Sequence, residues 1–222
     1  LCNNVSKDIQ SAVKDSDLII LAIPLSSYKE VLLSAKDSFK KGAIVTDTGS
    51  VKKEVNKIFE NLDLTDIFWI ASHPIAGTEE SGPSAGFKDL FKNRWTIICE
   101  NKKSNKDKVE KLKKFWEFLG SKVKSMSIDE HDHILALTSH LPHAVAYNIV
   151  KTAISTDEKF RDEIIKYSAG GLRDFTRIAS SDPLMWRDIF IDNSENIIKI
   201  LDEFSKNIDD FKKAITEKNG DK

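Results

Sequence analysis

Short apolar runs alternate with amphipathic stretches along the first half of the chain. The runs at residues 17–24, 43–48 and 66–71 have the length and the β-branched or aromatic character of buried strands. The stretches between them, at residues 27–39 and 51–61, carry apolar residues at helical spacing and predict helices. Alternation of strand and helix is typical of a parallel sheet covered by helices.

The pattern changes near the middle of the chain. Two further strands are predicted at residues 95–100 and 122–127, around a helix at 105–119 that Gly120 is well suited to end. Beyond residue 127 the strand signal stops. We therefore expect an α/β domain over residues 1–127 and an all-α domain over residues 128–222. The other predicted helices lie at residues 9–14, 131–155, 158–167 and 183–217.

The last predicted helix carries a long apolar stripe. A helical region of roughly 90 residues offers little surface to cover such a stripe internally, so we expect a homodimer built on this region. The residues of the stripe recur at three- and four-residue spacing: Ile189, Ile197, Ile200, Leu201, Phe204, Ile208, Phe211 and Ile215.

The first strand, at residues 17–24, is apolar on both faces, as expected of a central strand with neighbours on each side. Two preceding strand–helix units would need on the order of 60 residues, and only 16 residues precede Asp17. No G-x-G-x-x-G run occurs among the nine glycines. We therefore expect that the chain lacks the first strands and the glycine-rich loop of a complete fold.

Charge and composition narrow the classes of partner. The 34 basic and 35 acidic residues are interspersed and nearly cancel, which argues against nucleic-acid or membrane partners. The longest apolar run, at residues 18–23, is far shorter than the ~20 residues that span a bilayer. The first residues do not resemble an export signal, so a cytoplasmic location is expected. Cys2 and Cys99 are interpreted as reduced thiols without a functional role.

The motif S-H-P-I-A-G-T-E is the strongest candidate for chemistry. His73 follows an apolar strand, and Pro74 and Gly77 interrupt the strand pattern directly after it. Ligands of open α/β sheets bind outside the carboxyl ends of the strands, so His73 is expected to face a substrate. A structural histidine is the alternative.

The motif D-T-G-S follows the second strand of the alternating pattern. A single D-T-G in a strand–helix context does not fit an aspartic protease, which pairs two such loops. Ser50 is instead predicted to cap the next helix. The same loop, at the carboxyl end of a strand and the start of a helix, is well placed to meet a cofactor or an anionic substrate.

Four of the five histidines cluster in His131-Asp-His133 and His140-Leu-Pro-His143. No accompanying metal-ligand motif is present, and the i, i+2 spacing does not share a helix face, so no metal site is expected. His140 and His143 do share a face and could present two donors to a carboxylate or carbonyl. Two partly exposed helix histidines are the alternative.

Two arginines follow a glycine pair. On a helical turn Arg173 and Arg177 share a face, and their guanidinium forks suit an acid with more than one carboxylate. Asp174 either orients one of these arginines or neutralises it. Trp186 is as well suited to a dimer interface as to a pocket.

Taken together, five motifs resemble the prephenate dehydrogenase family of the tyrosine pathway, in the family's order and over essentially the whole chain. They are A-I-P, D-T-G-S-V-K, H-P-I-A-G-T-E, S-H-L-P-H-A-V-A and F-T-R-I-A-S-S-D-P-L-M-W-R-D-I-F. The resemblance implies a partial dinucleotide-binding, Rossmann-like domain over residues 1–127 and a helical substrate-binding and dimerisation domain over residues 128–222. It also implies NAD-dependent oxidative decarboxylation of prephenate to 4-hydroxyphenylpyruvate and carbon dioxide.

The resemblance also implies roles for individual residues. His73 would accept the proton of the ring hydroxyl, and Ser50 would orient that hydroxyl and His73. Arg177 would hold the ring carboxylate, while His143 and Arg173 would face the pyruvyl side chain. The other substrate-binding residues implied are Thr78, Glu79, Asp174 and Trp186, of which Glu79 and Asp174 would gate the pocket. The implied NAD-binding residues are Ile23, Pro24, Asp47, Thr48 and Gly49.

Three alternatives stay open at this point. An arogenate dehydrogenase has the same chemistry with an amino group in place of the keto oxygen, and the histidine pair of S-H-L-P-H favours prephenate by resemblance. Another hydroxyacid dehydrogenase of similar architecture would not need two arginines and a histidine aimed at a dicarboxylate. The third is an inactive fragment that associates as a helical dimer without binding a nicotinamide.

Overall fold

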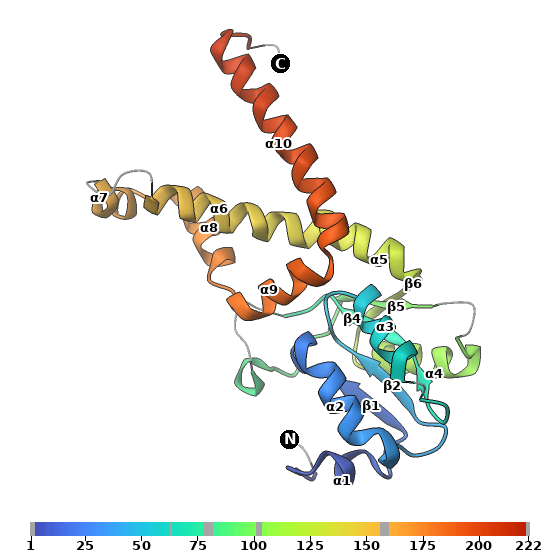
Figure 1. Ribbon diagram of the computed structural model, residues 1–222. Helices are drawn as coiled ribbons and strands as arrows, with labels where there is room; N and C mark the ends of the chain where they lie inside the picture. Colours follow the sequence, from blue (N-terminus) through green and yellow to red (C-terminus); the bar gives the residue numbers. More distant parts are fainter. Residues whose placement is uncertain (1–2, 63, 78–81, 101–103, 156–159, 221–222) are drawn as a thin grey trace. The chain divides into compact units, whose positions relative to one another are not determined.

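The computed structural model describes residues 3–62, 64–77, 82–100, 104–155 and 160–220 (Figure 1). The chain divides into two compact units. The first comprises residues 1–132 and 182–192, and the second comprises residues 133–181 and 193–222. No helix in the described parts of the chain is both long enough and apolar enough to cross a membrane.

Within the described residues, six short strands form the centre of the first unit. Strands β1 (Leu18–Leu21), β2 (Ile44–Asp47) and β3 (Phe68–Trp69) are parallel, with β2 in the middle and β1 at an edge. After Ile70, β4 (Ala71–Pro74) pairs antiparallel with β5 (Trp95–Cys99). Strand β5 pairs in parallel with β6 (Lys122–Met126).

One prediction about these strands is corrected, and another holds for part of them. The single strand expected at residues 66–71 is two strands, which belong to different three-stranded ladders. The parallel arrangement predicted for the first three strands is confirmed for β1, β2 and β3, but it does not extend to the antiparallel pair of β4 and β5. A parallel pair needs a long crossover, usually a helix, whereas the described part of the β4–β5 connection contains only the 3₁₀ turn η3 (Pro83–Ala85).

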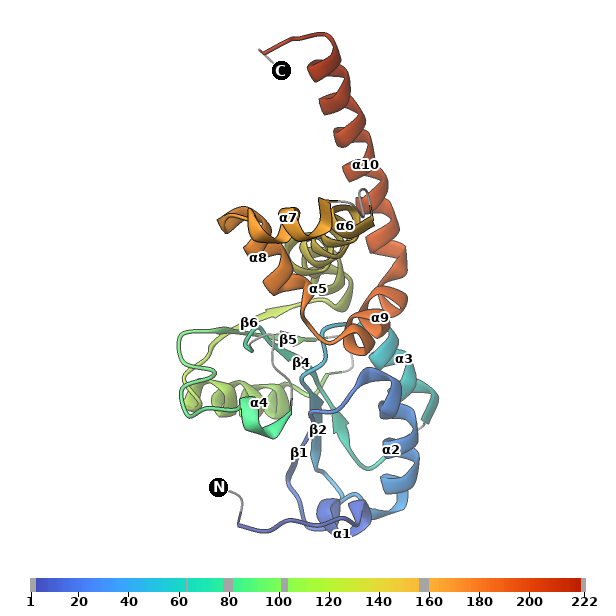
Figure 2. The same cartoon turned by 90° about the vertical axis from the view of Figure 1, so that its left-hand side faces the viewer.

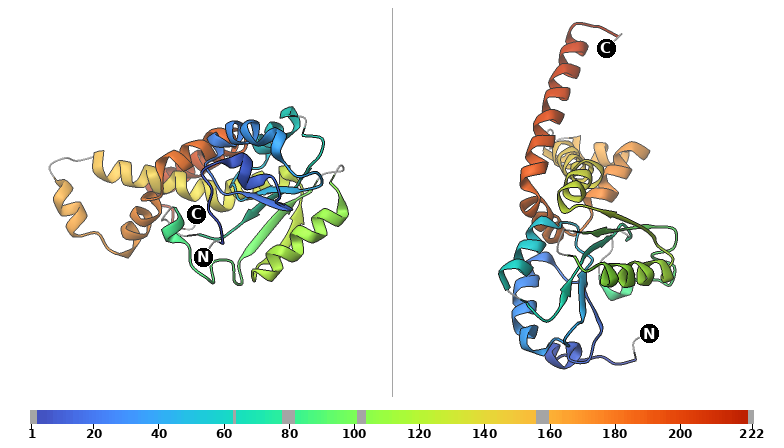
Figure 3. Two further views of the ribbon diagram at one scale, coloured as in Figure 1. Left: turned by 90° about the horizontal axis from the view of Figure 1, so that it is seen from below. Right: turned by 90° about the vertical axis from the view of Figure 1, so that its right-hand side faces the viewer.

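Helices cover both faces of the layer that these six described strands form. Helices α2 (Tyr28–Ala35) and α3 (Lys53–Leu62) lie on one face, and α4 (Lys106–Phe118) lies on the other (Figures 2 and 3). Each face has its own apolar cluster. The first contains Tyr28, Leu32, Val45, Val55 and Phe59, and the second contains Ile44, Ile70, Ile98, Leu112 and Trp116.

Local capping explains where several helices begin and end. Asn105 caps α4 by accepting a hydrogen bond from the Lys108 amide, and Gly120 follows the helix with φ of 93°, as the sequence predicts. Asp8 caps α1 (Ile9–Val13). The helix predicted at residues 27–39 is shorter, because the 3₁₀ turns η1 (Leu25–Ser27) and η2 (Lys36–Ser38) flank α2.

The second unit is helical. Helix α5 (Ile128–Leu135) begins in the first unit and continues through a π-helical turn, η4 (Ala136–His140), into α6 (Leu141–Ser155). Helix α8 (Gly170–Ala179) runs beside α6, and the end of α10 (Ser194–Thr216) extends beyond the rest of this unit (Figure 1). The short α7 (Arg161–Lys166) lies between α6 and α8 in the chain.

The helix predicted at residues 183–217 is two helices. The segment α9 (Pro183–Asp192) belongs to the first unit, whereas α10 belongs to the second. They meet at Asn193, which is buried and whose side-chain nitrogen lies 3.1 Å from Nδ1 of His140. Because apolar residues keep a helical spacing on both sides of Asn193, the periodicity alone does not reveal the break.

Candidate active site

The carboxyl ends of β1, β2 and β4, with the loops after β1 and β2, lie at the same end of the first unit's strands. We call this end the carboxyl edge. The Thr48 amide donates to the Leu21 carbonyl at 3.1 Å, which joins the loop after β2 to the end of β1. The hydroxyls of Thr46 and Ser72 lie 2.8 Å apart and join β2 to β4. This edge therefore gathers the sequence-predicted residues Ile23, Pro24, Thr48, Gly49, Ser50 and His73.

Asp47 is the exception among the expected NAD contacts. Its side chain is fully buried and forms an ion pair with the equally buried Lys52, whose ammonium also donates to the Ser72 carbonyl at 2.8 Å. The amides of Gly49 and Ser72 donate to the same carboxylate at 3.0 and 3.1 Å. The Asp47 carboxylate is therefore an internal anchor of this edge, and a contact of this residue with NAD stays a prediction.

Tyr28 completes the surroundings of Asp47. Its hydroxyl lies 3.3 Å from the carboxylate, and burial, together with that negative charge, raises the pKa of Tyr28 well above its usual range. The phenol therefore stays protonated and acts as a donor to Asp47.

Gly49 is packed closely against this anchor. A Cβ at this position would lie 2.8 Å from Leu25 Cδ2, 2.9 Å from Asp47 Oδ2 and 3.1 Å from the Tyr28 hydroxyl. Only glycine fits here without a shift of the neighbours. The half-buried residues 48–50 thus lie close against the loop that follows β1.

Ser50 does not cap the next helix, and this prediction is wrong. Helix α3 begins at Lys53, two residues later than expected. The amides of Lys52 and Lys53 each donate to a carboxylate oxygen of Asp132 at 2.9 Å. An acidic side chain from a distant part of the sequence therefore satisfies the helix start.

His73 lies within β4, opposite Ile97 of β5, and is only 8% exposed. The strand that was expected to end at His73 ends one residue later, at Pro74. Its Nδ1 lies 2.9 Å from Nε2 of His131, which is fully buried at the start of α5. Sequence reasoning missed His131, Asp132 and Lys52 as members of this site.

Burial acts in opposite directions on the pKa values of His131 and Asp132. It lowers the pKa of His131, which favours the neutral imidazole. Burial alone would raise the pKa of Asp132, but hydrogen bonds from His131 and from the Lys52 and Lys53 amides outweigh it and hold that pKa below its usual value. Near neutral pH Asp132 is therefore ionised beside a neutral His131.

The second unit contains the predicted acid-binding residues. Arg173 and Arg177 are exposed on α8, and an Arg177 nitrogen lies 3.9 Å from the Asp174 carboxylate, a loose surface pair. His143 is half-buried on the neighbouring α6, with Nδ1 2.9 Å from the Ser139 carbonyl. The unit thus brings these cationic and imidazole groups onto two adjacent helices.

His140 is not the partly exposed partner expected for His143. It is fully buried beside Asn193, so the hypothesis of two histidines presented to one carboxylate is wrong. The π-helical turn that contains His140 precedes Pro142. Because proline lacks an N–H and clashes with the carbonyl four residues back, a locally widened helix accommodates it.

The remaining expected substrate residues differ in their placement. Thr78 and Glu79 lie outside the described residues. Trp186 is buried in the first unit, with its ring centroid 5.5 Å from that of Phe190. Its contact with a substrate stays a prediction.

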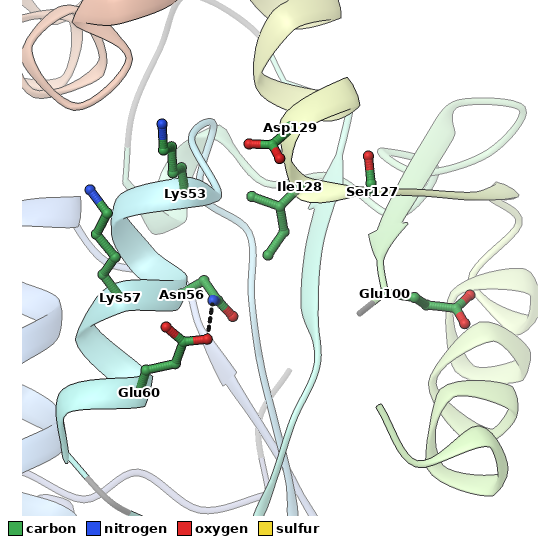
Figure 4. A pocket seen from close by; sticks show the side chains of 8 residues that line it. All are labelled: Lys53, Asn56, Lys57, Glu60, Glu100, Ser127, Ile128 and Asp129. Atoms are coloured by element: carbon green, nitrogen blue, oxygen red, sulfur yellow. Dashed lines mark hydrogen bonds between the residues drawn. The ribbon is translucent and has the colours of Figure 1, made fainter. Parts of the chain in front are cut away.

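A cavity of about 680 Å³ lies beside α3, and the described residues that line it include none of the predicted site residues (Figure 4). Its walls carry both charge signs, including Lys53 and Lys57 from α3 and Glu100 and Asp129 from outside it. Within the described parts of the chain, no cluster of three histidine, cysteine or acidic side chains is arranged to hold a metal ion.

Comparisons with known proteins identify the family. Residues 1–125 match the nucleotide-binding domain of prephenate dehydrogenase, and residues 127–222 match its dimerization domain. The chain belongs to the prephenate dehydrogenase family. This confirms the resemblance found in the motifs and the fold class of a Rossmann-like domain followed by a helical domain.

Individual relatives agree with this family. The cyclohexadienyl dehydrogenase of Zymomonas mobilis is 38% identical over 221 residues, which cover 100% of this chain and 75% of the relative. The prephenate dehydrogenase of Bacillus subtilis is 31% identical over 212 residues, which cover 95% of this chain and 57% of the relative. The chain thus spans between about half and three quarters of these proteins.

Solved structures of the family have the same fold. The crystal structure of prephenate dehydrogenase from Aquifex aeolicus has a TM-score of 0.88 and 34% identity, and covers 97% of this chain and 76% of that one. The A. aeolicus enzyme in complex with hydroxyphenyl propionate and NAD+ has the same TM-score and 36% identity, and covers 96% and 74% of the two chains.

Proposed function

We propose that the chain performs the NAD-dependent oxidative decarboxylation of prephenate to 4-hydroxyphenylpyruvate, carbon dioxide and NADH. The observation that carries this proposal is a histidine, His73, held by a second imidazole at the carboxyl edge of a sheet in a member of this family. The family and its nucleotide-binding domain support an NAD-dependent oxidoreductase, and the relative with bound NAD+ supports the choice of cofactor.

The loops at this edge fit a nucleotide. The close packing around Gly49 lets backbone rather than side chains meet a ligand, and the loop after β1 at Ile23 and Pro24 lies beside it. Ile23, Pro24, Thr48 and Gly49 would hold the cofactor. NAD, when bound, accepts the hydride that leaves the ring carbon.

His73 supplies the proton transfer. A neutral imidazole accepts the proton of the ring hydroxyl while the hydride leaves the ring carbon that carries this hydroxyl. Loss of carbon dioxide then returns its bonding electrons to the ring and makes it aromatic. His73 gives the proton back to the phenolate oxygen, so that no net proton is consumed. Ser50, on the neighbouring loop, would orient the hydroxyl.

The second unit supplies charge complementary to a dicarboxylate. Arg177 would bind the ring carboxylate through its guanidinium fork, and Arg173 and His143 would face the pyruvyl side chain. The exposure of both arginines on one helix beside α6 supports these roles. Asp174, close to Arg177, would compete with the substrate for that guanidinium and so gate the pocket.

Substitution of His73 tests the proposal. His73→Asn should lower kcat by about 10²- to 10⁴-fold with little change in the KM for prephenate, the range for a lost general base. His133→Asn, at an exposed position of α5, is the matched control, and its kcat and KM should equal those of the wild type. An unchanged kcat in the His73 variant would refute the assignment of the base.

Substitution of Arg177 tests the substrate. Arg177→Ala should raise the KM for prephenate by about 10- to 100-fold, because the charge interaction exists in the ground state as well as in the transition state. Arg177→Lys keeps the charge but loses the fork, so its KM should be intermediate. Parallel assays with arogenate decide between the two substrates, and a higher kcat/KM for arogenate would overturn the choice of prephenate.

We also propose a cytoplasmic homodimer without nucleic-acid or membrane partners. The dimerization-domain match and the apolar end of α10, where Phe211 and Ile215 are 60% and 61% exposed, support the association. A groove of about 710 Å³ between α6 and α10 continues this apolar surface. Light scattering should give the mass of a dimer, Phe211→Glu should give a monomer, and Lys206→Glu on the same helix should change nothing.

A further inference from the structure

A buried chain of hydrogen bonds lies behind His73. Its Nδ1 is 2.9 Å from Nε2 of His131, and Nδ1 of His131 is 2.7 Å from a carboxylate oxygen of Asp132. His131 and Asp132 are 0% and 1% exposed. All three residues belong to the first unit.

The start of α5 fixes this chain in place. Ser127 and Glu130 form a capping box, with the Ser127 amide donating to the Glu130 carboxylate at 2.8 Å and the Glu130 amide donating to the Ser127 hydroxyl at 3.2 Å. The box sets the first turn of the helix, on which His131 and Asp132 follow. Asp132 is fixed further by the amides of Lys52 and Lys53.

The ionisation of Asp132 decides which nitrogen donates in each of these hydrogen bonds. An ionised carboxylate only accepts hydrogen bonds, so Nδ1 of His131 must carry the proton that faces it. A neutral His131 then has an unprotonated Nε2, which accepts. His73 must donate to it from Nδ1, which leaves Nε2 of His73 as the basic nitrogen of the ring.

We propose that His131, anchored by Asp132, is a positioning residue that sets the tautomer of His73 and stabilises its imidazolium form. The proposal rests on the function proposed above, in which His73 is the base. When His73 takes a proton at Nε2, its Nδ1–H becomes a donor from a cation, and its hydrogen bond to His131 strengthens. The ionised Asp132 stabilises the resulting positive charge through His131.

Two variants separate this role from simple packing. His131→Phe keeps a ring of similar size but offers no acceptor, whereas the side-chain oxygen of His131→Gln can reach the position of Nε2. His131→Phe should lower kcat by about 10- to 100-fold, the range for a lost hydrogen bond to a charged group, with unchanged KM values for prephenate and NAD. His131→Gln should recover most of the activity.

The pH profile supplies a second readout. Loss of the acceptor weakens the imidazolium of His73, so the acid limb of kcat/KM should move to lower pH in His131→Phe. Among the described residues, the charged groups that act on His131 are Asp132 on α5 and Asp47 and Lys52 at the β2–α3 connection. The charge of Asp192 on α9 interacts in turn with Asp132. Of these groups, Asp132 loses its hydrogen bond from His131 in the variant but keeps those from the Lys52 and Lys53 amides. A merely structural role for His131 would leave the acid limb where it is.

Nitrogen-15 spectra of the histidine side chains in the wild-type protein test the tautomer without any turnover. His73 should be protonated at Nδ1 and His131 at Nδ1. A His73 protonated at Nε2 would overturn the proposal, as would equal activities of the Phe variant and the wild type. A Gln variant that folds but is no more active than the Phe variant would also overturn it.

The kinetic controls separate this proposal from the proposed function. If His73→Asn is impaired while His131→Phe retains full activity and an unshifted profile, the positioning role fails and the function stands. If the wild type does not oxidise prephenate, the function fails, and the spectra still decide the tautomer.

Discussion

Replacement of Lys52 by methionine probes the internal anchor of the candidate site. Lys52 and Asp47 are both fully buried, and the ammonium bridges the Asp47 carboxylate and the Ser72 carbonyl. Methionine has a similar length but no charge. The substitution therefore leaves a buried carboxylate without its cation at the point where the loop after β2 meets β4.

The expected loss in the free energy of unfolding depends on the hydrogen bonds that Asp47 keeps in the variant. Removal of one partner of a buried ion pair typically destabilises a protein by about 3–5 kcal/mol. Asp47 retains donors from the Gly49 amide, the Ser72 amide and the Tyr28 hydroxyl, which favours the lower end, about 3 kcal/mol. At roughly 2–4 °C per kcal/mol for a chain of this size, Tm should fall by about 6–12 °C.

Urea unfolding monitored by tryptophan fluorescence measures this cost. All four tryptophans, Trp69, Trp95, Trp116 and Trp186, belong to the first unit, so their fluorescence reports on the unit that contains the ion pair. The matched control is Lys57→Met, because Lys57 and Glu54 form an exposed pair worth at most about 0.5 kcal/mol. A loss below about 1 kcal/mol for Lys52→Met would refute the reasoning, because such a loss is typical of surface pairs.

Two further predictions concern packing and pH. Gly49→Ala should weaken NAD binding in calorimetric titrations, because the new Cβ would lie 2.8 Å from Leu25 Cδ2; Gly171→Ala, with no atom within 4 Å of its Cβ, should bind NAD normally. Burial and the charges of Asp188 and Glu54 raise the pKa of Asp192 to about 6. A carboxyl group with a raised folded pKa contributes stability below its unfolded pKa and loses it as the pH rises through the folded value, so Asp192→Asn should raise Tm at about pH 7.5 but not at about pH 4. An equal change in Tm at both pH values would contradict this assignment.

The sequence predicts those parts of the molecule that depend on local periodicity and turn chemistry. The strands that became β1, β2, β5 and β6 and the helix α4 with its terminal glycine follow from apolar runs and caps. The position of His73 near a strand end follows from the same signals. Such features involve residues close in the chain, which local patterns describe directly.

Other features depend on pairings that local patterns do not contain. The hydrogen bonds from the Lys52 and Lys53 amides to Asp132 join residues about 80 positions apart and displace Ser50 from the helix start. The side chain of Asn193 interrupts an apolar periodicity that otherwise reads as one helix. The capping box at Ser127 and Glu130 is the one local signal for the helix start that carries His131.

The central claim is that His73 removes the proton of prephenate's ring hydroxyl while NAD is reduced. The most direct measurement follows the absorbance of reduced nicotinamide after NAD and prephenate are mixed with the protein expressed from its full natural reading frame, with 4-hydroxyphenylpyruvate quantified in the same samples. The account predicts equal amounts of NADH and 4-hydroxyphenylpyruvate, and a loss of both in His73→Asn. Equal turnover by the wild type and the His73 variant, or no turnover by the wild type, would contradict it.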